Sequence, residues 1–336
     1  MRKALVVGPS WVGDMVMAQT LFKVLKANDP NILIDILAPD WSRPLTARMP
    51  EVHDAIAMPV GHGALELKKR WQISRSLRAE QYDEAYVLPN SFKSALVPFL
   101  TGIPKRVGWR GEWRYGVLNT VHILDKAQYP LMIERFIALG FPKHAQLPKP
   151  LPLPSLVRNE QNLEQAKLKF NLSTDLPILV LCPGAEFGPS KRWPEHYYAD
   201  VAKRYLEKGW QVWLFGSVKD ASITSDIQNI TQHQCVNLAG KTSLAEAIDL
   251  MSLADLVVSN DSGLMHIGAA LGRPLIAIYG STDPTFTPPL GQKVQIVRTN
   301  ESCSPCFKRT CPLNHHACMQ RLKPMQVLAA CEALTI

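Results

Sequence analysis

The chain has 336 residues, of which 46% are hydrophobic and 20% charged, a balance that excludes an intrinsically disordered protein. Nearly all of the net charge of +8 lies in the first half, where residues 1–160 hold 21 Lys and Arg against 14 Asp and Glu. No apolar run approaches the ~18 residues that span a bilayer, and the short apolar N-terminus lacks a signal peptide's cleavage site. We therefore expect a cytoplasmic protein, long enough for two domains, whose first half faces an anionic partner. Nucleic acid is not expected, because no nucleic-acid-binding motif accompanies the charge.

Apolar runs of strand length alternate with helical patterns along the whole chain. In the first half, strands are predicted at 4–7, 32–37, 54–57 and 84–88, with helices that include 15–27 and 65–77. Four prolines within residues 148–154 then predict a stiff linker. The alternation resumes with strands at 178–182, 211–215, 235–238, 255–258 and 275–279. The pattern predicts an α/β protein with two doubly wound parallel sheets, in domains 1–155 and 156–322, followed by a helix at 323–336 that would be able to pack back on the first domain.

Polar and glycine-rich motifs follow the predicted strands of the second half, where doubly wound sheets bind their ligands. Gly184 permits close approach of a ligand to the backbone, and the adjacent cations Lys191 and Arg192 suit a phosphate. Asp220, just past the next strand, suits the hydroxyls of a ribose. The stretch 259–266 leads from a strand into a helix start, where free N–H groups and the helix dipole favour an anion. One nucleoside diphosphate would use all of these loops, although each loop alone also fits a capped helix or a charged surface loop.

The first loop of the chain carries an acid where a phosphate-binding loop would carry a cation. Gly8 and Gly13 have the glycine spacing of a Walker A motif, but Asp14 stands where Lys is required. Asp14 would repel a phosphate and suits a general base that accepts a proton from a hydroxyl. It also suits an ordinary first-turn acid, whose carboxylate the helix dipole stabilises and so weakens as a base. Farther on, Ser243 with Glu246 predicts a capping box.

Four motifs in register resemble the bacterial ADP-heptose:lipopolysaccharide heptosyltransferases over essentially the whole chain. They are Gly13-Asp14, Pro183-Gly184-Ala185 with Lys191-Arg192-Trp193-Pro194, Gly216-Ser217 with Asp220, and Asn260 to His266. Residues 8–14, 89–94 and 108–111 are more similar to the members that add the second heptose than to those that add the first. The resemblance implies a GT-B fold, with two Rossmann-like domains that face a central cleft. It also implies inverting transfer of heptose from ADP-heptose to heptosyl-Kdo2-lipid A, with no cofactor and no metal in the active site.

The resemblance and the chemistry of the residues together suggest roles for individual side chains. Asp14 is the expected base, and Lys191 the expected catalytic cation that neutralises the leaving diphosphate. The expected donor-binding residues are Lys191, Gly216, Ser217, Asp220, Lys241, Thr242, Asp261, Ser262, Gly263 and His266. The expected acceptor-binding residues are Gly13, Asn90, Lys93, Arg110 and Arg114, with Arg106 as a further candidate for acceptor phosphates. Two alternatives stay open, namely a first heptosyltransferase that acts on Kdo2-lipid A and a non-catalytic nucleotide-sugar-binding protein.

A basic stretch in the first half indicates either a membrane-facing helix or a solvated helix face. Its cations are Lys68, Lys69, Arg70, Arg75 and Arg78. Since the acceptor implied by the resemblance lies in a membrane leaflet, we expect peripheral association with the inner face of the cytoplasmic membrane.

Four of the seven cysteines crowd into a short segment near the C-terminus. They are Cys303, Cys306, Cys311 and Cys318, with His315 and His316 among them. One C-x-x-C knuckle is followed by irregular spacing, so structural zinc is one interpretation and free thiols are the favoured one. On the spacing alone, we expect purified protein to carry less than stoichiometric metal.

Overall fold

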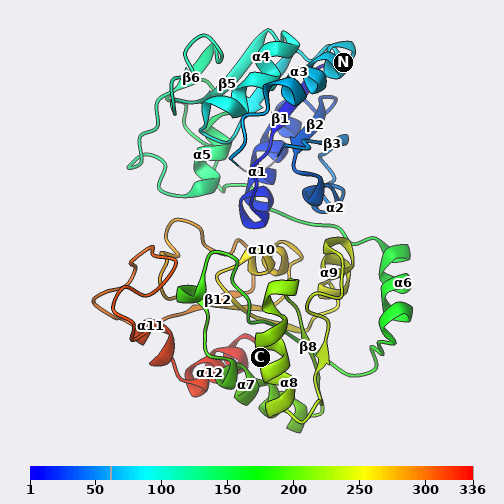
Figure 1. The fold of residues 1–336 in the computed structure, drawn as a ribbon, viewed down its shortest axis with the longest axis vertical. Helices are drawn as coiled ribbons and strands as arrows, with labels where there is room; N and C mark the ends of the chain where they lie inside the picture. The colour runs from blue at the N-terminus through cyan, green and yellow to red at the C-terminus, as the bar shows by residue number, and fades with distance from the viewer. Residues whose placement is uncertain (61–62, 336) are drawn as a thin grey trace. The chain divides into compact units, whose positions relative to one another are not determined.

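The computed structural model describes residues 1–60 and 63–335 and consists of two compact units (Figure 1). The first unit is Met1–Pro154, and the second begins at Ser155, just after the last of the four linker prolines. Each unit has its own parallel sheet and its own apolar core.

The sheet of the first unit has six parallel strands in the order β3-β2-β1-β4-β5-β6. Its strands are β1 (Lys3–Val7), β2 (Leu33–Ala38), β3 (Asp54–Ala57), β4 (Glu84–Val87), β5 (Lys105–Trp109) and β6 (Thr120–His122). Its helices are α1 (Val12–Asn28), α2 (Arg43–Thr46), α3 (Leu67–Leu77), α4 (Leu96–Thr101) and α5 (Met132–Ala138). The doubly wound sheet predicted from the alternation is confirmed. The pattern missed β5 and β6, whose apolar runs are short and interrupted by charge or polar residues.

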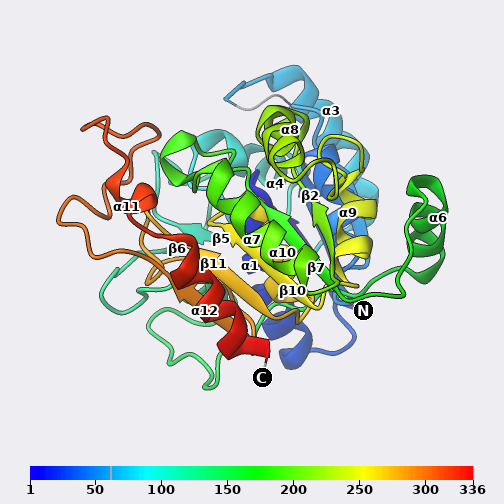
Figure 2. The same ribbon diagram turned by 90° about the horizontal axis from the view of Figure 1, so that it is seen from below.

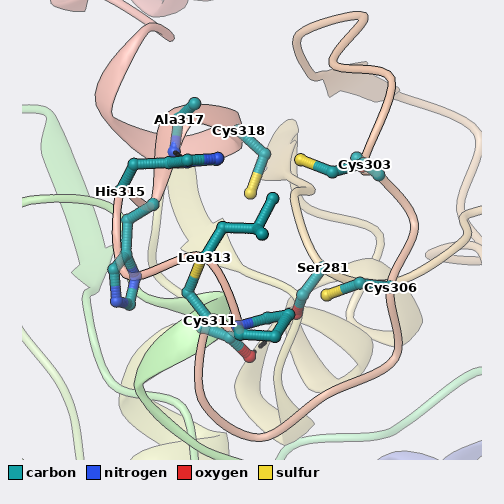
Figure 3. Close-up of a pocket in the computed structure, with 12 residues that line it drawn as sticks. Ser281, Cys303, Cys306, Cys311, Leu313, His315, Ala317 and Cys318 are labelled. Atoms are coloured by element: carbon teal, nitrogen blue, oxygen red, sulfur yellow. Dashed lines mark hydrogen bonds between the residues drawn. The ribbon is translucent and has the colours of Figure 1, made fainter.

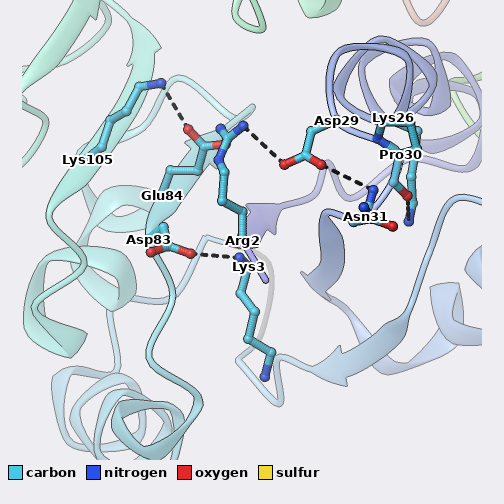
Figure 4. A network of polar contacts seen from close by, with 9 residues as sticks. All are labelled: Arg2, Lys3, Lys26, Asp29, Pro30, Asn31, Asp83, Glu84 and Lys105. Atoms are coloured by element: carbon cyan, nitrogen blue, oxygen red, sulfur yellow. Dashed lines mark hydrogen bonds and ion pairs between the residues drawn. The ribbon is translucent and has the colours of Figure 1, made fainter.

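The amino ends of the strands in the first unit are held by a network of charges (Figure 4). The carboxylate of Glu84, whose side chain is 3% exposed, accepts hydrogen bonds from Arg2 at 2.6 Å and from Lys105 at 2.9 Å. The backbone N–H of Lys3 donates to Asp83 at 2.8 Å. These charges at the amino ends neutralise one another, whereas ligands of such sheets bind at the carboxyl ends. The network therefore stabilises the fold, and the opposite edge of the sheet is where a ligand is expected.

The second unit repeats the same topology, with the strand order β12-β11-β10-β7-β8-β9. Its strands are β7 (Ile178–Cys182), β8 (Gln211–Leu214), β9 (Val236–Asn237), β10 (Leu256–Asn260), β11 (Leu275–Ile278) and β12 (Val294–Val297). Its helices are α6 (Glu160–Phe170), α7 (Glu195–Glu207), α8 (Ala221–Ile230), α9 (Leu244–Met251), α10 (Gly263–Ala270), α11 (Ala317–Gln320) and α12 (Pro324–Thr335). The predicted capping box of α9 is confirmed, because Ser243 Oγ accepts from the Glu246 N–H at 3.2 Å and Glu246 accepts from the Ser243 N–H at 2.7 Å.

The C-terminal helix α12 packs within the second unit, over the sheet and beside α7 (Figure 2). Its buried residues Val327, Ala330 and Cys331 join the core formed by α7 and the inner strands. We expected a helix at 323–336 that would be able to pack back on the first domain. In the structure, these apolar side chains contribute to the core of the second unit. The last residue of the predicted helix, Ile336, lies outside the described residues.

Candidate active site

The strand order of the second sheet reverses between β7 and β10, and the segments after these two strands carry Lys191 and the predicted donor residues between Asp261 and His266. Asn260, the last residue of β10, is fully buried and ties the two loops together. Its Nδ2 donates to the Pro183 carbonyl at 2.6 Å, and its Oδ1 accepts from the Trp193 N–H at 3.2 Å and from the Tyr198 hydroxyl at 3.0 Å. The motif included Asn260 without assigning it a role. The available signal was that Asn260, after Ser259, is the second polar residue at the end of a strand that begins with three buried apolar residues.

Lys191 and Asp261 form a nearly buried ion pair at this point. Lys191 Nζ lies 2.5 Å from Asp261 Oδ2, with the two side chains 14% and 6% exposed. The Thr282 hydroxyl donates to the same oxygen at 2.5 Å. Lys191 belongs to the short 3-10 turn η4 (Pro189–Lys191) after β7, whereas Asp261 directly follows β10. Two residues predicted separately are thus in direct contact, and Thr282 is a partner that the sequence analysis missed.

Helix α10 begins beside this ion pair. The hydroxyl of its N-cap residue, Ser262, forms a hydrogen bond of 3.3 Å with Ser259 Oγ and does not cap the helix N–H groups, which remain available to an anion. His266 lies in the first turn and is 6% exposed. Burial lowers the pKa of His266 to about 4, opposed by the charge of Asp261 and aided by that of Lys191. The ring is therefore neutral near pH 7 and can hydrogen-bond a ligand without carrying charge.

Asp220 lies after β8 and is held by its own loop. It is 7% exposed, and its Oδ2 accepts from the backbone N–H of Ser217 at 2.9 Å and from the Ser217 hydroxyl at 2.8 Å. Its Oδ1 lies 3.7 Å from Arg192 Nη2. A Cβ added to Gly184 would come within 2.3 Å of Asp220 Cγ, so glycine is required there. Arg192 Nε is buried and has no hydrogen-bond partner among residues 1–60 and 63–335, which leaves it as a donor for a ligand.

The remaining donor candidates lie at the same edge of the second sheet. Gly216 and the exposed Ser217 follow β8, while the exposed Lys241 and the half-buried Thr242 follow β9. The hydroxyl of Thr242 donates to the Leu238 carbonyl at 3.5 Å. The structure thus places every predicted donor residue in a loop or helix start that follows a strand of one sheet.

In the first unit, the order reverses between β1 and β4, and Asp14 follows β1. It lies with Gly13 in the first turn of α1, half-buried, at the positive end of the helix dipole. The loops after β4 and β5 touch each other, since a Cβ on Gly111 would lie 2.2 Å from the Asn90 carbonyl oxygen. The exposed Asn90 and Arg110 are thereby neighbouring candidates for acceptor contacts. Lys93, half-buried, follows in the 3-10 turn η3 (Phe92–Ala95).

Three arginines expected at the acceptor or the membrane point inward instead. Arg114 is 2% exposed and donates to the carbonyls of Pro89, at 2.7 Å, and of Trp109. Arg106 donates to the carbonyls of Val117 and Ile103, at 2.7 and 2.5 Å. Arg70 is 5% exposed and donates to the carbonyls of Leu65 and Lys93, at 2.6 and 2.9 Å. Burial lowers the pKa of all three guanidinium groups. These arginines donate to backbone carbonyls and so stabilise the fold. The Nε atom of Arg114 is nevertheless buried without a hydrogen-bond partner among residues 1–60 and 63–335, as is that of Arg192.

Both sheets have the Rossmann strand order. Where the order of the second sheet reverses, the structure has a buried cation and an open helix start, and where the order of the first sheet reverses it has an acid. These features and the fold are those of a GT-B glycosyltransferase. The sequence profile of glycosyltransferase family 9 (heptosyltransferase) matches residues 70–317, and the chain belongs to this family.

Known proteins are similar to the chain over most or nearly all of its length. It is 49% identical to lipopolysaccharide heptosyltransferase 2 of Escherichia coli K12, over 99% of both chains. It is 50% identical to lipooligosaccharide heptosyltransferase 2 of Haemophilus ducreyi, over 88% of both chains. The solved structure of E. coli ADP-heptose LPS heptosyltransferase II superposes with a TM-score of 0.89 at 46% identity, covering 100% of this chain and 98% of that one. Within the described residues, no helix is long and apolar enough to cross a membrane.

Proposed function

We propose that this glycosyltransferase moves L-glycero-D-manno-heptose from ADP-heptose to heptosyl-Kdo2-lipid A in inner-core lipopolysaccharide synthesis, with inversion at the anomeric carbon. The observation that carries the proposal is the Lys191–Asp261 ion pair at the open start of α10, 2.5 Å across and nearly buried. The choice of the second heptose over the first is supported by relatives named heptosyltransferase 2 at 49 and 50% identity.

The donor would be held by the loops after β7, β8 and β10. Its diphosphate would be bound by Lys191, by the buried Nε of Arg192 and by the first N–H groups of α10. A diphosphate carries more negative charge than one carboxylate and therefore competes for Lys191 Nζ. Once Lys191 turns to the phosphates, Asp261 is released to accept hydroxyls of the heptose. Asp220, already oriented by Ser217, would accept the ribose hydroxyls.

The transfer is a single displacement. The acceptor's hydroxyl oxygen forms a bond to the anomeric carbon of heptose while the bond from that carbon to the β-phosphate oxygen breaks. Asp14 takes the hydroxyl proton, and ADP leaves with the electron pair. The charge that develops on the leaving phosphate is stabilised by Lys191 and the α10 dipole, and the neutral His266 ring can donate a hydrogen bond there.

The acceptor would bind to the first unit. Arg110 and Asn90 are exposed at the carboxyl edge of its sheet and, with Lys93, suit phosphate and carboxylate groups. Helix α3 carries an exposed stripe in which Leu67 and Trp71 are 55% and 47% exposed.

Arg75 stacks 4.9 Å from the Trp71 ring centre, and Lys68, Lys69 and Arg78 are also exposed. Leu67, Trp71 and Arg75 lie on one face of α3. Apolar and basic side chains on one helix face fit an anionic leaflet, so we place peripheral membrane binding there, on the cytoplasmic side. Sedimentation with phosphatidylglycerol vesicles tests this directly. The W71A variant should bind them several-fold more weakly, whereas W41A, which changes another exposed tryptophan, should bind normally. Equal binding by W71A would refute the placement.

The function is tested by measuring ADP release from ADP-heptose with each acceptor in turn. We expect release with heptosyl-Kdo2-lipid A and little with Kdo2-lipid A. Faster release with Kdo2-lipid A would assign the first heptose transfer instead. Binding of ADP-heptose without release in the presence of either acceptor would make the protein a non-catalytic nucleotide-sugar-binding protein.

A further inference from the structure

The segment between β12 and α11, together with the start of α11, brings four cysteine side chains around one small pocket (Figure 3). We call residues 299–318 the cysteine loop. Its thiols are those of Cys303, Cys306, Cys311 and Cys318. The loop is irregular up to the start of α11, and the space that it encloses is about 20 Å³, enough for about one water molecule or one ion.

We propose that Cys303, Cys306, Cys311 and Cys318 together bind one divalent metal ion in a closed, tetrahedral structural site, for which Zn²⁺ is the fitting ion. Four thiolates leave no open position for substrate, and they are the ligand set of structural zinc. On binding, each sulfur forms a bond to the ion and each thiol releases its proton to solvent. His315 is not needed, because its Nδ1 already accepts the Ala317 N–H at 2.9 Å.

The described residues contain no ready-made group of three or more metal ligands, and Leu313 lines the same pocket as the four thiols. Binding therefore requires the cysteine side chains to turn toward one point and Leu313 to withdraw. Without an ion, the four neutral thiols have no attraction for one another that would bring their sulfur atoms to one point. The spacing alone favours free thiols, and the placement of all four around one ion-sized pocket is what favours a metal instead.

The cysteine loop is anchored to the residues beside the Lys191–Asp261 ion pair. Ser190, next to Lys191, donates from Oγ to the Lys308 carbonyl at 2.5 Å and from its N–H to the Arg309 carbonyl at 3.1 Å. Ser281, next to Thr282, accepts the Phe307 N–H at 2.7 Å. A Cβ on Gly188 would lie 2.4 Å from the Arg309 carbonyl oxygen, so the two backbones are in close contact.

The part of the cysteine loop between Cys306 and Cys311 thus supports both η4 and the residue before Thr282. A bound ion would fix that support and would hold Lys191 in position for the donor. The metal site itself does not depend on the proposed reaction, whereas its effect on the donor rests on it.

The test uses untagged full-length protein purified under reducing conditions. Elemental analysis should find about one zinc per chain in the wild type and far less in C303S and C306S. The C235A variant removes a buried cysteine from the same unit but outside the cysteine loop, and it should keep its zinc. Protein loaded with Co²⁺ should show the thiolate charge-transfer absorption of a tetrahedral site.

The wild type provides a second measurement if the serine variants fail to fold. Titration of its thiols with an organomercurial should release the zinc to a chelating dye as these four thiols react. A reduced protein that contains no zinc and takes up none when it is added would overturn the proposal, as would zinc that C303S and C306S both retain.

Removal of the ion should also weaken ADP binding by roughly tenfold to a hundredfold, because small misplacements of a positioned group have effects of that size. The KM for ADP-heptose should rise in the same way, while the KM for the acceptor should not change. Unchanged ADP affinity in zinc-free protein would refute the claim that the metal-bound cysteine loop holds Lys191 in position for the donor.

Discussion

Replacing Lys191 by Ala separates the structural and catalytic parts of the buried ion pair. The change removes the cation from the Asp261 carboxylate, which is 6% exposed beside Lys191, and keeps the hydrogen bond from the Thr282 hydroxyl. Breaking a buried pair in this way costs about 3–5 kcal/mol, and we take about 3 because Lys191 keeps some contact with solvent. For a unit of this size, that loss lowers Tm by roughly 6–12 °C.

Activity should fall independently of stability. Loss of one charged group that stabilises a developing anion costs about 10²–10³ in kcat. The double variant K191A/D261N removes both charges, so it should recover most of the lost stability without recovering turnover. Relative to D261N alone, it should still be slower by about 10².

The assays are thermal unfolding, ADP binding by calorimetry and ADP release with acceptor present. K219A is the matched control, since Lys219 is a neighbouring lysine whose side chain is 72% exposed and is paired with the exposed Glu186 at 2.5 Å. The control should behave as the wild type. If K191A/D261N turned over as fast as D261N, Lys191 would be a structural partner of Asp261 and our assignment would be refuted.

Three further predictions follow from the site. D14N should bind ADP-heptose normally and lose about 10²–10⁴ in kcat, as expected when a general base is removed; undiminished turnover would show that Asp14 only caps its helix. His266 is neutral when folded, with a pKa of about 4 against about 6.5 unfolded, so the unfolded chain binds the proton more readily. Its contribution to stability, about 3 kcal/mol, should be present above pH 6.5 and should decline as the pH falls toward 4. Between pH 6.5 and pH 4, the free energy of unfolding of H266Q, measured by denaturation, should fall less steeply than that of the wild type. Parallel plots of unfolding free energy against pH for the two proteins would contradict the account. R114M should lose about 2–4 kcal/mol of stability, because the Pro89 and Trp109 carbonyls lose a charged donor. R110M, at an exposed position, should keep its Tm and raise the KM for the acceptor. If R110M lowered the Tm and R114M raised only the KM for the acceptor, then Arg110 would be the structural residue and Arg114 the one that binds the acceptor.

The sequence predicted the elements whose signals are local. The buried runs of β1, β7 and β10, the capping box at Ser243 and the linker prolines depend on side chains close together in the chain. Strand β5 was missed because it begins with the charged Lys105 and Arg106, which leaves an apolar run of only three residues, 107–109. The strand pairing that places β7 next to β10 is a long-range feature that periodicity does not contain.

The candidate site was predictable residue by residue but not as an arrangement. The loop motifs identified Lys191 and Asp261, yet these residues lie 70 positions apart and their contact depends on the strand order. Inward-pointing arginines were unpredictable for a related reason. A guanidinium beside a loop binds either a ligand's phosphate or the loop's own carbonyls, and only the packed structure of the Arg114 environment distinguishes the two.

The central claim is tested most directly by mass spectrometry and NMR of the acceptor after incubation with the enzyme and ADP-heptose. We predict that heptosyl-Kdo2-lipid A gains one heptose per ADP released and that the new linkage has the anomeric configuration opposite to that of the donor. An acceptor of unchanged mass, with Kdo2-lipid A converted in its place, would contradict the account, as would a product that retains the donor's configuration.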